Sequence, residues 1–164
     1  ERLAAAGHAK GVPVPRPMLG RPGCDFSFSG LKTAVRHRIL DLGAAAAEPA
    51  TIADLCAGFQ AAAGDVLVDR SARALRREAG HCRALVVAGG VAANLYLRQR
   101  LEQVAEKAGI LLIAPPLELC TDNAVMVAWA GIERLRLGPD DDQGMPARAR
   151  WPLEELTPPT PALG

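Results

Sequence analysis

The sequence lacks several features that would assign it to a specialised class of protein. No apolar run reaches the roughly 18 residues that a membrane-spanning helix needs, because glycine or a charged residue interrupts each candidate. The chain opens without the basic segment and apolar core of a signal peptide. It also lacks an initiator methionine, so we expect the sequence to begin inside a longer protein. These absences predict a protein with no membrane partner.

A charge imbalance and paired cysteines are missing as well. The 19 Lys and Arg residues nearly balance the 18 Asp and Glu residues, which leaves a net charge of +1. Whole-chain charge therefore does not identify a nucleic-acid-binding protein, and only local basic clusters can argue for one. The four cysteines show no C-x-x-C spacing, which is typical of reduced thiols in a cytoplasmic protein. That spacing gives no support to a disulfide framework or a zinc site.

The sequence does contain enough apolar material for a core. Its 164 residues are 49% hydrophobic and 23% charged, which is typical of one soluble globular domain. Alternate prolines over residues 12–18 exclude a helix there and predict an extended surface connection. Residues 25–29 alternate polar and aromatic side chains, which predicts a half-buried strand, and residues 31–42 predict a short helix.

A long helix is predicted over residues 51–79, where an apolar stripe recurs at helical spacing. Thr51 can cap its start and Gly80 can end it. Gly58 and Gly64 lie inside this helix, where glycine costs about 1 kcal/mol relative to alanine. The two glycines therefore predict either close packing against another element or a break into two helices.

Beyond residue 80 the pattern alternates strand and helix. Strands are predicted over residues 84–88 and 110–113, and helices over residues 93–108 and 121–137. Continuous apolar strands that alternate with helices are typical of an α/β sheet covered on both faces. The residues from 138 onward are acidic, then rich in arginine and proline, and they predict a peripheral tail.

Two glycines mark the first place where a ligand could bind. Gly89 and Gly90 lie between the predicted strand and helix, where glycine lets a ligand approach the backbone and a helix N-terminus favours an anion. A plain tight turn explains the same residues equally well. Asn94 follows in the first turn of the helix, where its side chain either binds a ligand or caps the helix.

A carboxylate at the start of the last predicted helix is the second candidate. Asp122 lies where the helix dipole favours a negative charge without any function, and where a carboxylate could also bind a divalent cation. A lone aspartate cannot hold a catalytic metal. The three histidines give it no help, because His8, His37 and His81 are far apart in the sequence.

Local basic clusters occur on two of the predicted helices. One cluster has four members and the other has two: Lys32, Arg36, His37 and Arg38, then Arg98 and Arg100. Such clusters contact phosphate backbones in some proteins, although a solvated helix face is the more common case.

Five motifs occur in the order found in a known family. Residues 26–33 (Phe-Ser-Phe-Ser-Gly-Leu-Lys-Thr), 88–94 (Ala-Gly-Gly-Val-Ala-Ala-Asn) and 120–123 (Cys-Thr-Asp-Asn) carry the resemblance, with Pro-Arg-Pro-Met at 15–18 and Arg-Trp-Pro-Leu at 150–153. From about residue 14 to 156 the chain resembles the bacterial tRNA N6-adenosine threonylcarbamoyltransferases. Two positions depart from the family's pattern: Ala124, where Gly is usual, and Leu95, where Arg is usual.

The resemblance implies a fold of the actin, sugar kinase and Hsp70 (ASKHA) superfamily, in which two α/β lobes surround a cleft. This chain would be the C-terminal part of such a two-lobe protein. Residues 1–24 would form an extended lead segment from the preceding lobe. Residues 25–137 would form a C-terminal lobe with a mixed sheet covered by helices, and residues 138–164 the peripheral tail.

The resemblance also implies site residues. Asn94, Gly89 and Gly90 would bind the adenylate substrate. Asp122 would be one ligand of a single divalent metal ion, Fe²⁺ or Zn²⁺, whose two histidine ligands this chain lacks. No side chain here is identified as a general base.

The implied activity is transfer of a threonylcarbamoyl group from threonylcarbamoyl-adenylate to N6 of the adenosine 3′ of the anticodon in tRNA. The implied protein partners are a paralogue of similar fold and a small P-loop ATPase. Because one lobe is missing, we expect the isolated chain to be inactive. Two alternatives stay open, a non-catalytic nucleotide-binding or interaction fragment and an ASKHA-type small-molecule kinase. The sequence has no H-E-x-x-H helix, which argues against a metallopeptidase.

Overall fold

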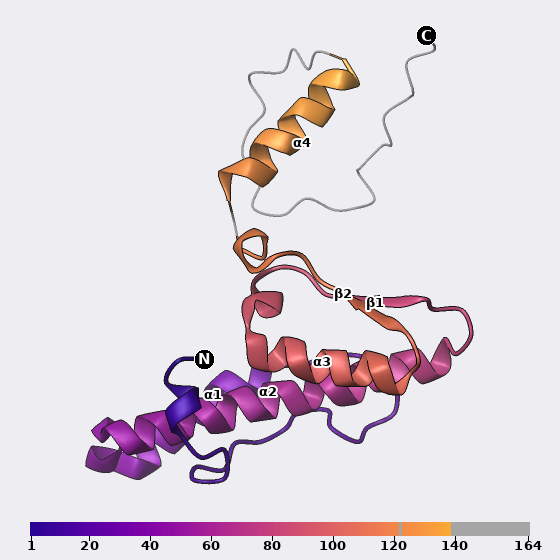
Figure 1. Ribbon diagram of the computed structural model, residues 1–164. Helices are drawn as coiled ribbons and strands as arrows, with labels where there is room; N and C mark the ends of the chain where they lie inside the picture. The colour runs from indigo at the N-terminus through magenta and orange to yellow at the C-terminus, as the bar shows by residue number, and fades with distance from the viewer. Residues whose placement is uncertain (122, 139–164) are drawn as a thin grey trace. The chain divides into compact units, whose positions relative to one another are not determined.

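The computed structural model describes residues 1–121 and 123–138, and the chain divides into two compact units (Figure 1). The first unit comprises residues 1–121 and the second comprises residues 122–164. The first unit holds the described helices and strands up to residue 119, so the candidate glycine turn and Asn94 lie within it.

The long helix α2 (Pro49–Arg77) is the central element of the first unit. It begins two residues earlier than predicted, because Pro49 at the first turn has a fixed φ that suits a helix and needs no backbone donor there. Ala62 and Val66 on its apolar stripe are fully buried. It is the one described helix that is long and apolar enough to span a membrane, but its buried stripe is also that of a core helix.

The two glycines inside α2 mark close packing, and the helix is continuous through both. A Cβ at Gly58 would lie 2.7 Å from the carbonyl oxygen of Val12. One at Gly64 would lie 3.0 Å from Nη1 of Arg100, in the helix packed beside it. Of the two alternatives that the sequence left open, the break into two helices is therefore wrong.

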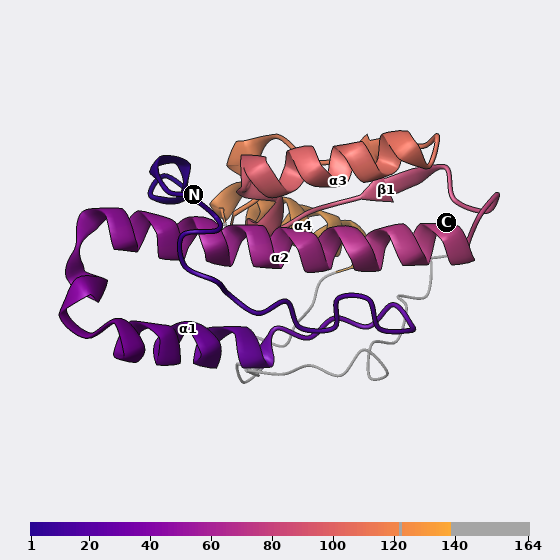
Figure 2. The same cartoon turned by 90° about the horizontal axis from the view of Figure 1, so that it is seen from below.

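The lead segment runs along α2 (Figure 2). It begins with the 3₁₀ turn η1 (Ala4–Ala6), which packs against α2. The prolines exclude a helix over residues 12–18, as predicted, but Val12 and Val14 are buried. The expectation of a surface connection is thus wrong for these side chains, because the alternation that exposes the prolines turns the valines toward α2.

Hydrogen bonds between the lead segment and α2 join the two at several points. The backbone N–H of His8 donates to Asp54 over 2.7 Å, and that of Gly20 donates to Asp69 over 3.3 Å. The fully buried Arg70 donates to the carbonyl oxygens of Arg21 and Gly23, each over 2.9 Å.

Helix α1 (Ser29–Leu42) follows, and the 3₁₀ turn η2 (Gly43–Ala47) joins it to α2. The strand predicted over residues 25–29 is absent: residues 25–28 have no regular structure and Ser29 already belongs to α1. The rings of Phe26 and Phe28 stack on each other with centroids 6.4 Å apart. The alternation thus pairs two aromatic side chains, since no neighbouring strand among the described residues pairs with this segment.

The predicted strand–helix–strand unit is present. Strand β1 (Ala84–Val86), helix α3 (Leu95–Lys107) and strand β2 (Leu111–Ile113) follow one another, and β1 pairs with β2 in parallel, with Leu85 opposite Leu112. Helix α3 packs against α2 and β2. The described sheet is therefore a two-stranded parallel one, reached through a helical crossover.

The described part of this sheet is not covered on both faces, which corrects the prediction. Val86 is 67% exposed, Leu111 70% and Ile113 51%, whereas the central pair Leu85 and Leu112 is half-buried. A mixed sheet is likewise not found among the described residues. Parallel sheets normally bury both faces, so the apolar strands predicted a covering that the described residues do not supply.

The second unit contributes helix α4 (Ala124–Arg136). It begins three residues later than predicted, because the Asn123 side chain accepts a hydrogen bond from the backbone N–H of Met126 over 2.9 Å and so acts as the N-cap. Of the tail predicted over residues 138–164, residues 139–164 lie outside the described part of the chain.

Candidate substrate-binding site

The glycine turn has the backbone that only glycine adopts readily. Gly89 has φ of 73° and ψ of −172°, and its carbonyl oxygen accepts from the N–H of Ala92 over 2.9 Å to open the 3₁₀ turn η3 (Gly90–Ala93). A Cβ on Gly89 or Gly90 would meet no atom within 4 Å. The turn therefore requires glycine at 89, and its outer side is open to a ligand.

Asn94 is the N-cap of α3. Its Oδ1 accepts from the N–H of Leu97 over 3.0 Å, and its Nδ2 donates to Oε1 of Gln60 on α2 over 3.1 Å. The capping role that the sequence offered for Asn94 is therefore present, and α3 begins at Leu95, two residues later than predicted. The two hydrogen bonds, one within α3 and one to α2, together fix the position of the Asn94 side chain.

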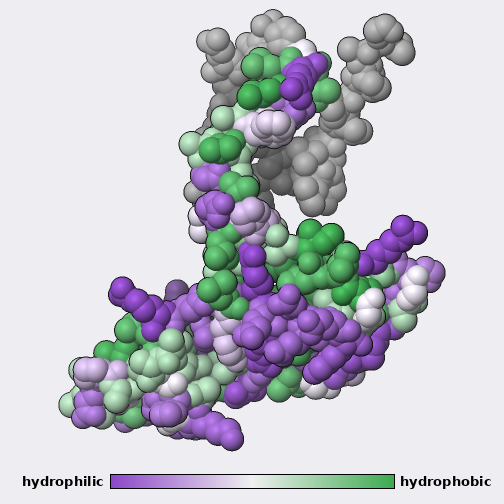
Figure 3. Space-filling view, in the orientation of Figure 1, coloured by the Kyte–Doolittle hydropathy of each residue, from purple (hydrophilic) through white to green (hydrophobic). Residues whose placement is uncertain are grey.

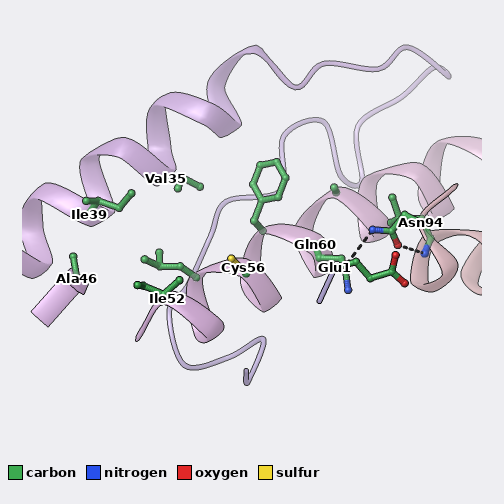
Figure 4. A pocket seen from close by; sticks show the side chains of 12 residues that line it. Glu1, Val35, Ile39, Ala46, Ile52, Cys56, Gln60 and Asn94 are labelled. Atoms are coloured by element: carbon green, nitrogen blue, oxygen red, sulfur yellow. Dashed lines mark hydrogen bonds between the residues drawn. The ribbon is translucent and has the colours of Figure 1, made fainter. Parts of the chain in front are cut away.

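A cavity of about 430 Å³ meets this asparagine (Figure 4). Glu1, Gln60 and Asn94 gather at one end, and apolar side chains of α1, η2 and α2 line the other, among them Val35 and Ile52. An apolar cavity with a few polar groups at one end is the usual form of a small-molecule site.

Glu1 is a member of this site that the sequence did not reveal. Its Oε1 accepts from the N–H of Leu95 over 3.1 Å, so a carboxylate lies at the N-terminus of α3. The sequence predicts an anion at this helix end, and in the chain itself Glu1 provides one. The two residues are 94 positions apart, and no local signal connects them.

Arg98 joins the glycine turn to the loop that follows β2. Its Nε donates to the carbonyl oxygen of Ala92 over 2.9 Å, and its Nη2 donates to that of Pro115 over 2.8 Å and to Sγ of Cys120 over 3.2 Å. Cys120 is buried. One guanidinium group thus fixes the distance between the end of η3 and the loop that leads to Thr121.

Arg100 also makes its contacts within the protein. Its Nη1 donates to Asp65 over 2.6 Å, and its guanidinium lies 5.7 Å from the ring centroid of Tyr96. Of the basic residues that the sequence offered as phosphate contacts, Arg98 and Arg100 are therefore structural. In the other cluster Lys32, Arg36 and His37 are exposed on α1.

The proposed metal ligand Asp122 lies outside the described residues. Within residues 1–121 and 123–138, no group of three His, Cys, Asp or Glu side chains could hold a metal ion. His8, His37 and His81 are each exposed. The donor set of the described residues therefore does not fit a metal centre by itself.

Comparison with protein-family models identifies the family of this chain. The family model described as tRNA N6-adenosine threonylcarbamoyltransferase matches residues 1–129. The chain belongs to this family. That result confirms the resemblance predicted from the motifs, all of which except the last lie within the matched residues.

Individual members of the threonylcarbamoyltransferase family match over almost the whole chain. The chain is 51% identical to the tRNA N6-adenosine threonylcarbamoyltransferase of Rhodospirillum rubrum, over 100% of this chain and 46% of the relative. It is 55% identical to that of Methylobacterium nodulans (98% and 46%) and 54% identical to that of Gluconobacter oxydans (98% and 45%). The chain thus spans about half the length of the curated relatives it matches.

Proposed function

We propose that this chain provides one part of an enzyme that transfers a threonylcarbamoyl group from threonylcarbamoyl-adenylate to N6 of the adenosine 3′ of the anticodon in tRNA. The observation that carries the proposal is the family match over residues 1–129, with relatives of that name more than 50% identical. In this proposal the chain is the C-terminal portion of a two-lobe ASKHA protein and acts in the cytoplasm.

Gly89, Gly90 and Asn94 are proposed to bind the adenylate. Two observations support this: the open outer side of the glycine turn, and the place of Asn94 at the polar end of the cavity. The carboxylate of Glu1 lies against Leu95 at the same end, so an anionic substrate group that approached the α3 N-terminus would displace it.

The reaction is acyl transfer. The adenosine N6 attacks the carbamoyl carbon of threonylcarbamoyl-adenylate. The bond from that carbon to the phosphate oxygen breaks, AMP leaves, and N6 loses a proton. An exocyclic adenine amine is a weak nucleophile, so holding it against the carbonyl must supply much of the rate. The Asn94 cap and the Arg98 bridge serve this positioning, because they fix the turn and the neighbouring loop.

Asp122 is proposed as one ligand of a divalent metal, iron or zinc, that would polarise oxygen atoms of the substrate when bound. The remaining ligands would come from outside the described residues. The paralogous partner and the P-loop ATPase belong to this proposal as predicted partners.

Substitution of Asn94 in the natural protein that contains this chain tests the proposal. Asn94→Ser keeps an oxygen that can cap α3 but removes the amide that Asn94 would offer to the substrate. We expect a rise of about tenfold in KM for threonylcarbamoyl-adenylate, which corresponds to about 1.4 kcal/mol of lost binding. Loss of the hydrogen bond from Asn94 to Gln60 should also lower the free energy of unfolding by about 0.5–1.5 kcal/mol. The measurement is transfer of labelled threonylcarbamoyl to tRNA.

Asn94→Ala is the companion variant. It removes the cap as well, so it should show the same KM as Asn94→Ser and a free energy of unfolding about 1 kcal/mol lower than that of Asn94→Ser. An unchanged KM in both variants would reject Asn94 as a substrate contact. A wild-type protein that phosphorylates a small molecule with ATP and leaves tRNA unmodified would reject the transferase itself.

A further inference from the structure

The C-terminal end of α2 forms one wall of a second hollow, which shares no lining residue with the cavity beside Asn94. Arg73, Arg76 and Arg77 line it, and Gly23 and Cys24 of the lead segment form its other wall. Its volume is about 400 Å³. Three of its five lining residues are arginines, so we call it the arginine hollow.

Arg70 fixes the wall opposite the helix. This residue is fully buried, and its Nη1 donates to the carbonyl oxygens of Arg21 and Gly23, each over 2.9 Å. The lead segment therefore cannot move away from α2 at this point without breaking both of these hydrogen bonds to a buried guanidinium. The arginine hollow is a built feature of the fold, since one wall is helix and the other is anchored backbone.

The carboxylates nearby do not neutralise the hollow. Asp69 accepts two bonds from Nε of Arg73, each 3.1 Å, and lies 3.1 Å from Nη2 of Arg70, so one carboxylate serves two guanidinium groups. Glu78 lies 3.6 Å from Arg77, whose side chain is 76% exposed, and such a pair contributes little in water.

The side chain of Arg76 has no hydrogen-bond or ion-pair partner within the residues that the structure describes. A third carboxylate is close, since Oδ2 of Asp25 would lie 3.8 Å from a Cβ on Gly23. Four arginines thus face three carboxylates around the hollow, which leaves one positive charge in excess. The helix dipole by itself favours Arg76 and Arg77 in the last turn. It does not account for Arg73, one turn earlier, or for the anchored wall of the lead segment.

We propose that the arginine hollow binds phosphodiester groups of the tRNA backbone. The choice of tRNA as the ligand of the hollow rests on the proposed function. Guanidinium forks bind phosphate oxygens two at a time, and a concave arrangement lets neighbouring arginines share one phosphate. Contacts of this kind position a nucleic acid without reading its sequence. The hollow would hold the tRNA while the glycine turn and Asn94 act on the adenylate.

The experiment compares two double variants of the natural protein that contains this chain. Arg76→Ala with Arg77→Ala removes the two exposed charges of the hollow. Arg2→Ala with Lys10→Ala removes two exposed charges elsewhere in the same unit and serves as the matched control. Binding of unmodified tRNA is measured by fluorescence anisotropy as a function of salt, and a thermal melt checks that both variants fold.

The hollow variant should bind tRNA about tenfold or more weakly, and its plot of log affinity against log salt should lose about 0.7–0.9 in slope for each phosphate contact removed. The control variant should keep the wild-type affinity and slope. Equal losses in both variants, or no loss in either, would overturn the arginine hollow as a tRNA site.

A titration with inorganic phosphate distinguishes a site for tRNA phosphodiesters from a site for a free phosphate group, because the arginines could bind either. If the hollow serves a free phosphate group, phosphate should bind the wild type with high affinity and the hollow variant should keep its affinity for tRNA, which would overturn the proposal. A wild type that binds no tRNA would overturn the proposed function as well. A wild type that modifies tRNA while the hollow variant binds tRNA normally would overturn this inference alone.

Discussion

Asp65 shows how much of this structure depends on single side chains. It accepts hydrogen bonds from Arg16 of the lead segment and, over 2.6 Å, from Arg100 of α3, so it connects three segments. Partial burial raises the pKa of Asp65, but the hydrogen bonds from Arg16 and Arg100 and their positive charges together outweigh burial. The net effect places its pKa below the ordinary value for aspartate.

This shift predicts a pH-dependent contribution to stability. Because the pKa is lower in the folded state than in the unfolded state, the contribution is complete above about pH 4 and is lost as the pH falls through the folded pKa. Asp65→Asn should lower the free energy of unfolding by about 1–3 kcal/mol at neutral pH, and the difference from the wild type should shrink in acid. Urea unfolding at several pH values measures both.

Asp41→Asn is the control for Asp65. Asp41 lies 3.8 Å from Arg38 with its side chain 66% exposed, so its loss should change stability by less than about 0.5 kcal/mol. An Asp65→Asn defect that stays constant down to the lowest pH would contradict the electrostatic explanation.

At the residue scale, local signals predicted part of the site. The turn at Gly89 and the capping option for Asn94 follow from residue types within a few positions of each other. The contact between Glu1 and Leu95 and the bridge from Arg98 to Cys120 join residues 94 and 22 positions apart. A single sequence has no periodicity that reports such pairs, because they depend on how the helices pack.

At the scale of elements, close packing of α2 yields a prediction for Gly58. A Cβ there would meet the Val12 carbonyl oxygen at 2.7 Å and Cγ2 of Val14 at 3.2 Å. The first neighbour is backbone and cannot rotate away, so Gly58→Ala should lower the free energy of unfolding by about 1–3 kcal/mol despite its better helix propensity. Chemical denaturation gives the value.

Gly30→Ala is the matched substitution for Gly58→Ala. Gly30 lies in α1, and a Cβ there would meet no atom within 4 Å, so this variant should show no loss of stability. If the two alanine variants were equally stable relative to wild type, the lead segment would not be packed on α2 as described.

Helices were predicted more closely than strands. The apolar stripe of α2 and the strand–helix–strand order from residue 84 follow from periodicity. The alternation over residues 25–29 has the same period as a strand, yet a strand exists only where another pairs with it. The sequence shows the side-chain alternation of that segment but does not show whether a neighbouring strand pairs with it.

For the whole molecule, the exposed face of the sheet predicts how substitutions there affect stability and the binding of a hydrophobic dye. Leu111 on β2 is 70% exposed, whereas Leu31 on α1 is 1% exposed. In the isolated chain, Leu111→Thr should change the free energy of unfolding by less than about 0.5 kcal/mol and should reduce the fluorescence of a bound hydrophobic dye. Leu31→Thr should destabilise the chain by about 2–5 kcal/mol. Equal destabilisation by the two would show that the face is covered.

The α/β character of the described residues followed from the alternation of strands and helices, but the extent of the sheet did not. The sequence predicted strands covered on both faces, and the described residues supply one pair with an exposed face. The chain spans about half the length of its curated relatives.

The contacts between the lead segment and α2 also set an order of events during synthesis. His8 meets Asp54, Arg16 meets Asp65 and Gly20 meets Asp69, with separations of 46, 49 and 49 residues. At a translation rate of about 5–20 residues per second, each donor waits about 2–10 s for its acceptor to be made. During that interval Val12 and Val14 remain without the helix that buries them, so this stretch offers apolar side chains to a ribosome-associated chaperone until α2 is made.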